Sequence, residues 1–277
     1  MVFNRNANVY PLKKQLSIFF FVLLCATGFA QKAHVLNLTN FDNRKIHFGF
    51  SLGMNVQDFR LVHWSPIGSN SVVRNDPTWG NQFPGEVDRT DTVRADIQTL
   101  VPGLTVAVVT NIRLGEYFDL RFLPGLSFGE RRLVYTIQDG TSLNARYLPV
   151  YDINTGTTDL QFISVKSTYL DFPLLVKYKS SRLNNQRPYI ISGFAYRIDI
   201  SKSGEEDLLQ LKHNSFYFEA GVGLDSYLRF FRFSTELKVS LGLNNLIGDA
   251  PVEQRQYYTH AIKDITSNIF TLSFHFE

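Results

Sequence analysis

The sequence predicts an all-β fold, an eight-stranded antiparallel transmembrane β-barrel of the outer-membrane type with short periplasmic turns and long external loops. Three observations predict it. Apolar residues recur at every second position in eight separate segments, the positions between them are rich in glycine and charge, and the connections alternate in length. Because successive side chains of a strand point to opposite faces, each segment has one apolar face and one polar face.

The first of these segments covers residues 45–64 and shows the pattern most clearly. Its apolar positions follow one another without a break from Ile46 to Val56, and the positions between them are small or polar. A tilted strand needs roughly 9–11 residues to cross a bilayer, so the segment is long enough to span one.

Seven further segments repeat this alternation. They are expected at residues 103–114, 118–137, 165–179, 189–200, 216–228, 231–243 and 268–276. Pro124 falls inside the third strand and has no amide hydrogen to donate, which predicts a bulge or a bend there.

The connections decide the architecture. Those expected at residues 65–101, 138–164 and 244–267 are long, the one at residues 201–214 is intermediate, and the others are tight turns. A helical turn or two is expected within residues 252–264. This alternation is typical of a barrel with both termini on the periplasmic side.

The alternative is a soluble barrel or sandwich with an apolar interior. Glycines on the polar faces and aromatic residues near the strand ends favour the membrane barrel.

The N-terminal thirty residues have the pattern of a cleaved signal peptide. Lys13 and Lys14 precede an apolar core at residues 16–25, and small residues at Gly28 and Ala30 suit a cleavage site. The core is too short for an anchor helix, and Leu24 before Cys25 does not suit a lipoprotein signal. We therefore expect a signal peptide at residues 1–30, a periplasmic lead-in at residues 31–44 and the barrel at residues 45–277.

Charge and cysteine content exclude several classes of function. Lys and Arg number 28 against 25 Asp and Glu, and Arg5, Lys13 and Lys14 lie in the presequence, which contains no acid. A near-neutral mature chain does not predict a nucleic-acid partner. Cys25 is the single cysteine, so cleavage removes any disulfide or thiol chemistry. Without a phosphate loop or a clustered metal motif, we expect no cofactor, metal or catalytic site.

The polar faces predict a network of paired charges in the barrel interior. An eight-stranded barrel is only just wide enough for its own side chains, and buried charges persist when they are paired. The alternative is a conducting pore, which the strand number disfavours. The charged residues expected in this lumen network are Asp119, Arg121, Asp171, Lys177, Arg197, Asp199, Glu219, Asp225, Glu236 and Lys238, with Lys179 on the same face.

An enzyme that works at the external rim is a second interpretation. Histidine beside aspartate or serine can support hydrolysis or acyl transfer, as in barrel proteases and acyltransferases. No local spacing links the candidates to one another. The residues concerned are His63, His213, His260, Asp76, Asp88, Asp91, Asp96 and Asp159.

Two stretches resemble known outer-membrane proteins. The opening KIHFGFSLGMN, residues 45–55, is similar to the first strand of many barrels of Bacteroidota. YLDFPLLVKYKS at residues 169–180, with NNQRPYIISGFAYRIDIS at residues 184–201, resembles the PorT family. This resemblance implies a non-enzymatic component of the type IX secretion system, which exports proteins and in gliding species supports motility. Its expected partners are membrane lipid and other outer-membrane and periplasmic secretion components. An adhesin-type barrel is a further alternative.

Overall fold

The computed structural model describes residues 35–77, 87–140, 145–148, 150–152, 157–160, 162–201, 209–248 and 257–277. The expected signal peptide at residues 1–30 lies outside the described residues. Residues Asn37–Glu277 form one compact unit. None of the helices in the described part of the chain is long and apolar enough to cross a membrane.

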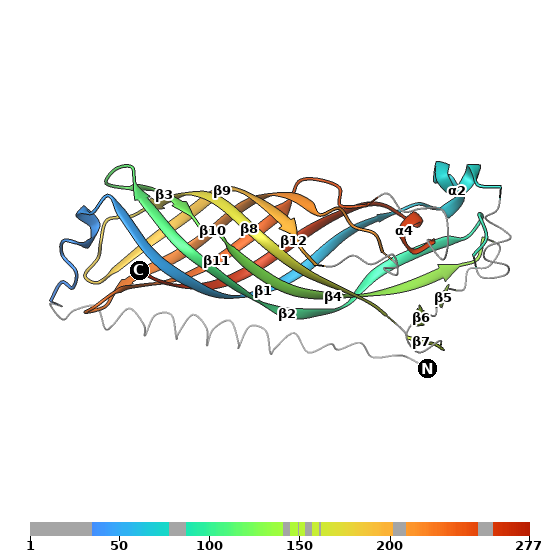
Figure 1. Cartoon of the computed structure of the whole chain (residues 1–277), viewed down its shortest axis with the longest axis horizontal. Coiled ribbons are helices and arrows are strands. Elements are labelled where there is room, and N and C mark those ends of the chain that lie inside the picture. The colour runs from blue at the N-terminus through green and yellow to red at the C-terminus, as the bar shows by residue number, and fades with distance from the viewer. Residues whose placement is uncertain are drawn as a thin grey trace, which may run out of the picture. The chain divides into compact units, whose positions relative to one another are not determined.

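The sheet closes into a ring with eight strand positions (Figure 1). β1 pairs with β12 on one side and with β2 on the other, and every pairing in the ring is antiparallel. β3 and β4 share one position because both pair with β2 and with β8. The strands are β1 (Ile46–His63), β2 (Thr92–Arg113), β3 (Phe118–Phe122), β4 (Gly125–Gln138), β8 (Ile163–Lys179), β9 (Gln186–Asp199), β10 (Asn214–Tyr227), β11 (Arg232–Gly242) and β12 (Ile262–Phe276). The predicted fold class is confirmed.

Besides the ring strands, the structure contains short strands and short helices. β5 (Ala145–Tyr147) extends the edge of β4, and β6 (Val150–Asp152) pairs with β7 (Thr157–Leu160), so the expected loop at residues 138–164 is partly strand. The helices are η1 (Phe41–Asn43), η2 (Ile67–Ser69), α2 (Ser71–Asn75) and α4 (Tyr257–His260). α4 lies inside the segment where a helical turn was expected. The Asn70 side chain accepts from Val72 N and caps α2.

The break between β3 and β4 falls at Leu123 and Pro124, where the sequence predicts a bend. Pro124 still accepts a hydrogen bond from Val108 N, at 2.9 Å. Leu123 N donates to the carbonyl of Pro173, at 3.2 Å, so the neighbouring strands hold the interrupted segment in line. The missing amide hydrogen of proline explains the interruption.

Two strands extend further than expected. β2 begins at Thr92 rather than near residue 103, and β12 begins at Ile262 rather than at residue 268. The pairing of β2 with β4 shifts register between Ile97 and Thr99 and again between Val101 and Thr105. Each shift inserts an extra residue and reverses the parity of the side chains, so the period-two pattern of β2 is interrupted twice.

The outer face of the ring forms an apolar belt. Phe48, Leu104, Phe194 and Leu237 are among its exposed side chains. Rings stack against one another near the short-turn end, with Phe50 and Phe276 centroids 4.7 Å apart. Tyr196 and Phe216 lie 4.9 Å apart on β9 and β10, toward the long loops. An exposed apolar band with aromatic residues at its edges is the surface that a membrane barrel presents to lipid.

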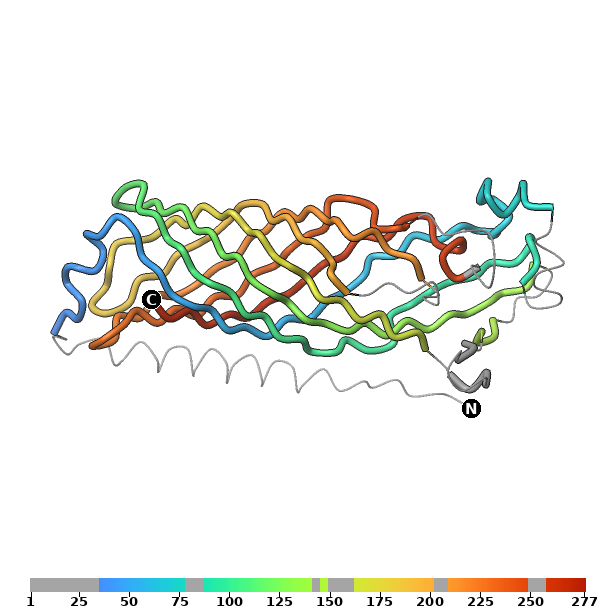
Figure 2. The backbone as a smooth tube through the Cα atoms, in the orientation of Figure 1, coloured from blue at the N-terminus to red at the C-terminus, as the bar shows by residue number. Residues whose placement is uncertain are grey.

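Beyond this belt, at the long-loop end, the polarity of the two faces reverses. The pairing of β1 with β2 ends at Val56 and Pro102, while β1 continues with β12 and β2 continues with β4 (Figure 2). Apolar side chains of the continuing strands are buried against those of the loops, and we call this cluster the head core. It comprises Phe59, Ile67, Val73, Val87, Val93, Ala95, Leu133, Tyr135, Ile137, Leu148, Ile163, Leu209, Leu246, Tyr258, Ala261, Ile262 and Ile265.

Candidate functional site

The lumen below the head core is filled by side chains that form ion pairs across the barrel. Arg121 on β3 and Glu236 on β11 are four positions apart in the ring, on opposite walls, and their side chains meet at 2.7 Å. Tyr189 OH also donates to Glu236, at 2.9 Å. Lys177 donates to both carboxylate oxygens of Asp225, at 2.7 and 2.8 Å. All four charged side chains are fully buried.

A second group of charges lies closer to the head core. Arg197 on β9 contacts Asp171 at 3.1 Å and Glu219 at 2.6 Å. Lys238 on β11 contacts the other oxygen of Glu219, at 2.7 Å. Ser127 donates to Asp171, which joins β4 to this group. Because one cation bridges two carboxylates and one carboxylate binds two cations, the charges of β8, β9, β10 and β11 neutralise one another.

At the short-turn end, residues 37–44 form an N-terminal cap over the lumen. Tyr227 OH donates to the carboxylate of Asp42 and lies 2.9 Å from each of its oxygens, and Asp42 pairs with Arg187 at 3.2 Å. Arg113 donates to the carbonyl of Asp42 at 2.7 Å. The segment was expected to be a simple lead-in, yet Asp42 extends the ion pairs of the lumen.

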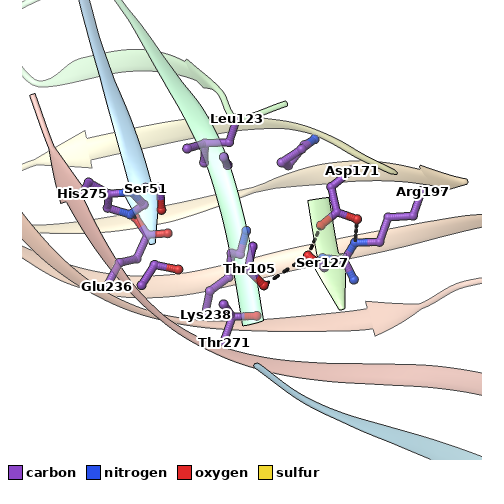
Figure 3. A pocket seen from close by; sticks show the side chains of 13 residues that line it. Ser51, Thr105, Leu123, Ser127, Asp171, Arg197, Glu236, Lys238, Thr271 and His275 are labelled. Atoms are coloured by element: carbon purple, nitrogen blue, oxygen red, sulfur yellow. Dashed lines mark hydrogen bonds and ion pairs between the residues drawn. The ribbon is translucent and has the colours of Figure 1, made fainter. Parts of the chain in front are cut away.

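A cavity of about 30 Å³ lies between the two groups of charges (Figure 3). Roughly two water molecules would fit in this volume. The residues around it are Ser51, Thr105, Ala107, Leu123, Ser127, Asp171, Pro173, Arg197, Glu236, Lys238, Thr271, Ser273 and His275. The figure shows Asp171 and Arg197 on one side of the cavity, with Glu236 and His275 on the other.

The predicted lumen residues divide into two sets. Asp199 is half-buried at the end of β9, where it accepts from Ser201 N at 3.0 Å, and it pairs with no cation among the described residues. Asp199 therefore stabilises the turn that follows β9 and does not join the lumen network. The other predicted residues are buried, with a partner for each. They are Asp119, Arg121, Asp171, Lys177, Lys179, Arg197, Glu219, Asp225, Glu236 and Lys238.

A comparison with known families identifies the fold. The family model described as "Outer membrane protein beta-barrel domain" matches residues 29–248. The chain belongs to this family. It is accordingly a protein of the bacterial outer membrane, so the short turns are periplasmic and the long loops are external.

Solved structures that are similar to this outer-membrane barrel include the crystal structure of the outer membrane protein OprG from Pseudomonas aeruginosa, with a TM-score of 0.37 and 10% sequence identity. The alignment covers 83% of this chain and 93% of that chain. No curated protein matches the chain by sequence.

Several lumen residues of this outer-membrane barrel were not predicted. Arg232 pairs with Glu277, and Glu277 also contacts Arg121 at 3.2 Å. Both lie two residues beyond predicted inward positions, so extending the alternation by one step would have found them. Asp42 gave no such signal, because residues 31–44 have no period.

Arg131 marks the boundary between the lumen and the head core. Its guanidinium is buried and donates to Ser167 Oγ and Ser267 Oγ, each at 2.9 Å, and to Tyr169 OH at 3.2 Å. The guanidinium carbon lies 4.0 Å from the centroid of the Phe59 ring. No carboxylate among the described residues pairs with Arg131, so hydroxyl groups and an aromatic face stabilise its charge.

Two of the histidines considered for catalysis, His63 and His213, contact main chain through their rings. His63 Nε2 accepts from Ala95 N at 2.9 Å, and His213 Nδ1 lies 3.2 Å from the carbonyl of Asp199. The carbonyl of His260 accepts from the Asn70 side chain at 3.0 Å. Burial lowers the pKa of His260, and the charge of Asp76 opposes this shift. The Asp159 side chain lies outside the described residues.

The candidate aspartates also serve local structure. Asp91 accepts from Asp88 N at 2.7 Å and from Gly140 N at 3.1 Å, which ties the start of β2 to the turn after β4. Asp96 is exposed. In the part of the chain that the structure describes, no three His, Cys, Asp or Glu side chains gather as a metal site would require.

Proposed function

We propose that this outer-membrane barrel is a closed, non-enzymatic scaffold that binds other components of the type IX protein secretion machinery, which also serves gliding in some species. The observation that carries the proposal is the ion pair between Arg121 and Glu236 on opposite walls. A barrel whose lumen is crossed by such pairs has little room to pass solutes, so it would act through its surfaces.

The resemblance to the PorT family of Bacteroidota supports the finer assignment to type IX secretion. The similar stretches, residues 169–180 and 184–201, correspond to most of β8 and β9. They contribute Asp171, Lys177 and Arg197 to the lumen. The residues that carry the resemblance thus include those that fill the barrel.

The surfaces available to secretion partners lie at the two ends. The periplasmic turns and the N-terminal cap would contact periplasmic components, and the head with its long loops would contact outer-membrane components. Membrane lipid covers the apolar belt between them.

A deletion strain tests the proposal. We expect loss of the chain to reduce the export of type IX cargo into the medium, and the chain restored from a plasmid to recover it. A pull-down from detergent-solubilised outer membrane should then recover other secretion components with the tagged chain. Normal cargo export in the deletion strain would rule the proposal out.

A further inference from the structure

A polar group stands on the outer surface of the barrel, just above the apolar belt. Arg132 Nε on β4 donates to Glu130 Oε1 at 2.9 Å, and Ser164 Oγ on β8 donates to the same oxygen at 3.0 Å. Lys166 is the register partner of Glu130. Register partners share a face of the sheet, so Lys166 and Arg132 flank one carboxylate. Their chain neighbours Arg131 and Ser167 are buried in the lumen, which places Arg132 and Lys166 outside.

The guanidinium of Arg132 is held in place from two sides. Its central carbon lies 5.0 Å from the centroid of the Phe162 ring, and its Nε donates to Glu130. The side chain remains 39% exposed. A guanidinium whose plane is fixed on a partly exposed side chain is suited to bind an oxyanion through two parallel hydrogen bonds.

The surface directly below this group is apolar. Phe128 and Leu126 precede Glu130 on the same face of β4 and are 42% and 37% exposed. Leu126 pairs with Leu170 on β8, so the apolar surface continues onto that strand. Acyl chains would cover these residues, and the cations would stand at the height where lipid headgroups begin.

We propose that Arg132 and Lys166 bind the phosphate group of an anionic lipid in the outer leaflet. The site carries two positive charges and one negative charge, so it retains an excess of positive charge for an anion. Its continuity with the lipid-facing belt points to a phospholipid or glycolipid phosphate rather than to a protein partner. Glu130 takes no part in binding the anion. It orients Arg132.

Retention of lipid by the purified barrel tests this site. The chain is reconstituted in phosphatidylcholine nanodiscs that contain a minor fraction of phosphatidic acid, then released into mild detergent, and the retained lipids are counted by native mass spectrometry. We expect phosphatidic acid to be enriched over phosphatidylcholine. Arg132→Gln and Lys166→Gln should each reduce this enrichment about fivefold, since one basic residue near a membrane surface contributes about that factor.

Three comparisons decide the outcome. Arg94→Gln removes an exposed charge from β2 within the head and should leave the enrichment unchanged. Arg132→Lys keeps the charge but loses the planar fork, so it should give an intermediate value. Added inorganic phosphate should not displace the lipid. An enrichment that survives the double substitution would overturn the proposal, as would an equal loss in Arg94→Gln or displacement by inorganic phosphate. Each variant must first show the gel shift between unboiled and boiled samples that marks a folded barrel.

Discussion

Arg121 and Glu236 are 115 residues apart in the sequence and stand on opposite walls of the barrel, yet Arg121 Nη1 lies 2.7 Å from Glu236 Oε2. Neither side chain is exposed. Each has other partners, since Arg121 also donates to Asn111 Oδ1 and Tyr189 donates to Glu236. Replacing either partner of such a pair should destabilise the protein, because the remaining charge would be buried without an opposite charge.

Glu236→Gln should therefore destabilise the barrel strongly. It leaves the buried guanidinium of Arg121 without one of its carboxylates, and breaking a buried pair costs about 3–5 kcal/mol. Urea unfolding in detergent micelles measures the loss. The partly exposed pair of Glu130 and Arg132 gives a matched control, because Glu130→Gln should cost about 1 kcal/mol or less. Equal losses in the two variants would contradict the role of the lumen pair.

Gly223→Ala should destabilise the barrel by about 1–3 kcal/mol, because an added methyl group would overlap the Tyr189 ring inside a packed lumen. Gly115→Ala is the control, since nothing lies within 4 Å of the position that its Cβ would take. The midpoint of the heat-dependent gel shift compares the two variants. If Gly223→Ala behaves like Gly115→Ala, the lumen is less crowded than its ion pairs indicate.

Leu133→Ala should weaken the head more than the membrane-spanning ring. Leu133 is fully buried in the head core, and such a truncation costs about 2–5 kcal/mol. Trypsin should then cleave the external loops faster, while the gel shift of the ring persists. Leu174→Ala provides the comparison, because Leu174 lies on the lipid-facing side of β8 and is 51% exposed. Its cleavage rate should match that of the native chain.

The head should lose stability in mild acid through His260. Burial lowers the folded-state pKa of His260 below 6.5, so the unfolded chain takes up a proton at a pH where the folded chain does not. The contribution is complete above pH 6.5 and is lost as the pH falls toward the folded pKa. The rate of loop proteolysis between pH 7 and pH 5 should rise less steeply in His260→Gln than in the native chain. Parallel profiles would exclude this contribution.

The membrane-spanning part of the fold could be predicted because its strands have a different environment on each face, which gives apolar and polar side chains a strict alternation. Lipid outside and paired charges inside keep the alternation unbroken, as between Ile46 and Val56 on β1. The same alternation placed most lumen charges on the correct face. It could not pair Arg121 with Glu236, because β3 and β11 face each other across the lumen only when the ring closes.

The part of the fold that contains the head core could not be predicted, for a different reason. The two bulges in β2 reverse its side-chain parity twice, and its inward face changes from polar, at Thr105, to apolar, at Val93 and Ala95. No single pattern of period two describes such a strand. The N-terminal cap was hidden as well, because Asp42 meets Tyr227 across 185 residues and has no local pattern.

Conductance across a planar lipid bilayer tests most directly whether the lumen of the barrel is closed. Purified native chain, inserted in the folded state that the gel shift verifies, should give no current steps above those of the bare membrane. Stable, stepwise currents that scale with the amount of inserted native chain would contradict the account.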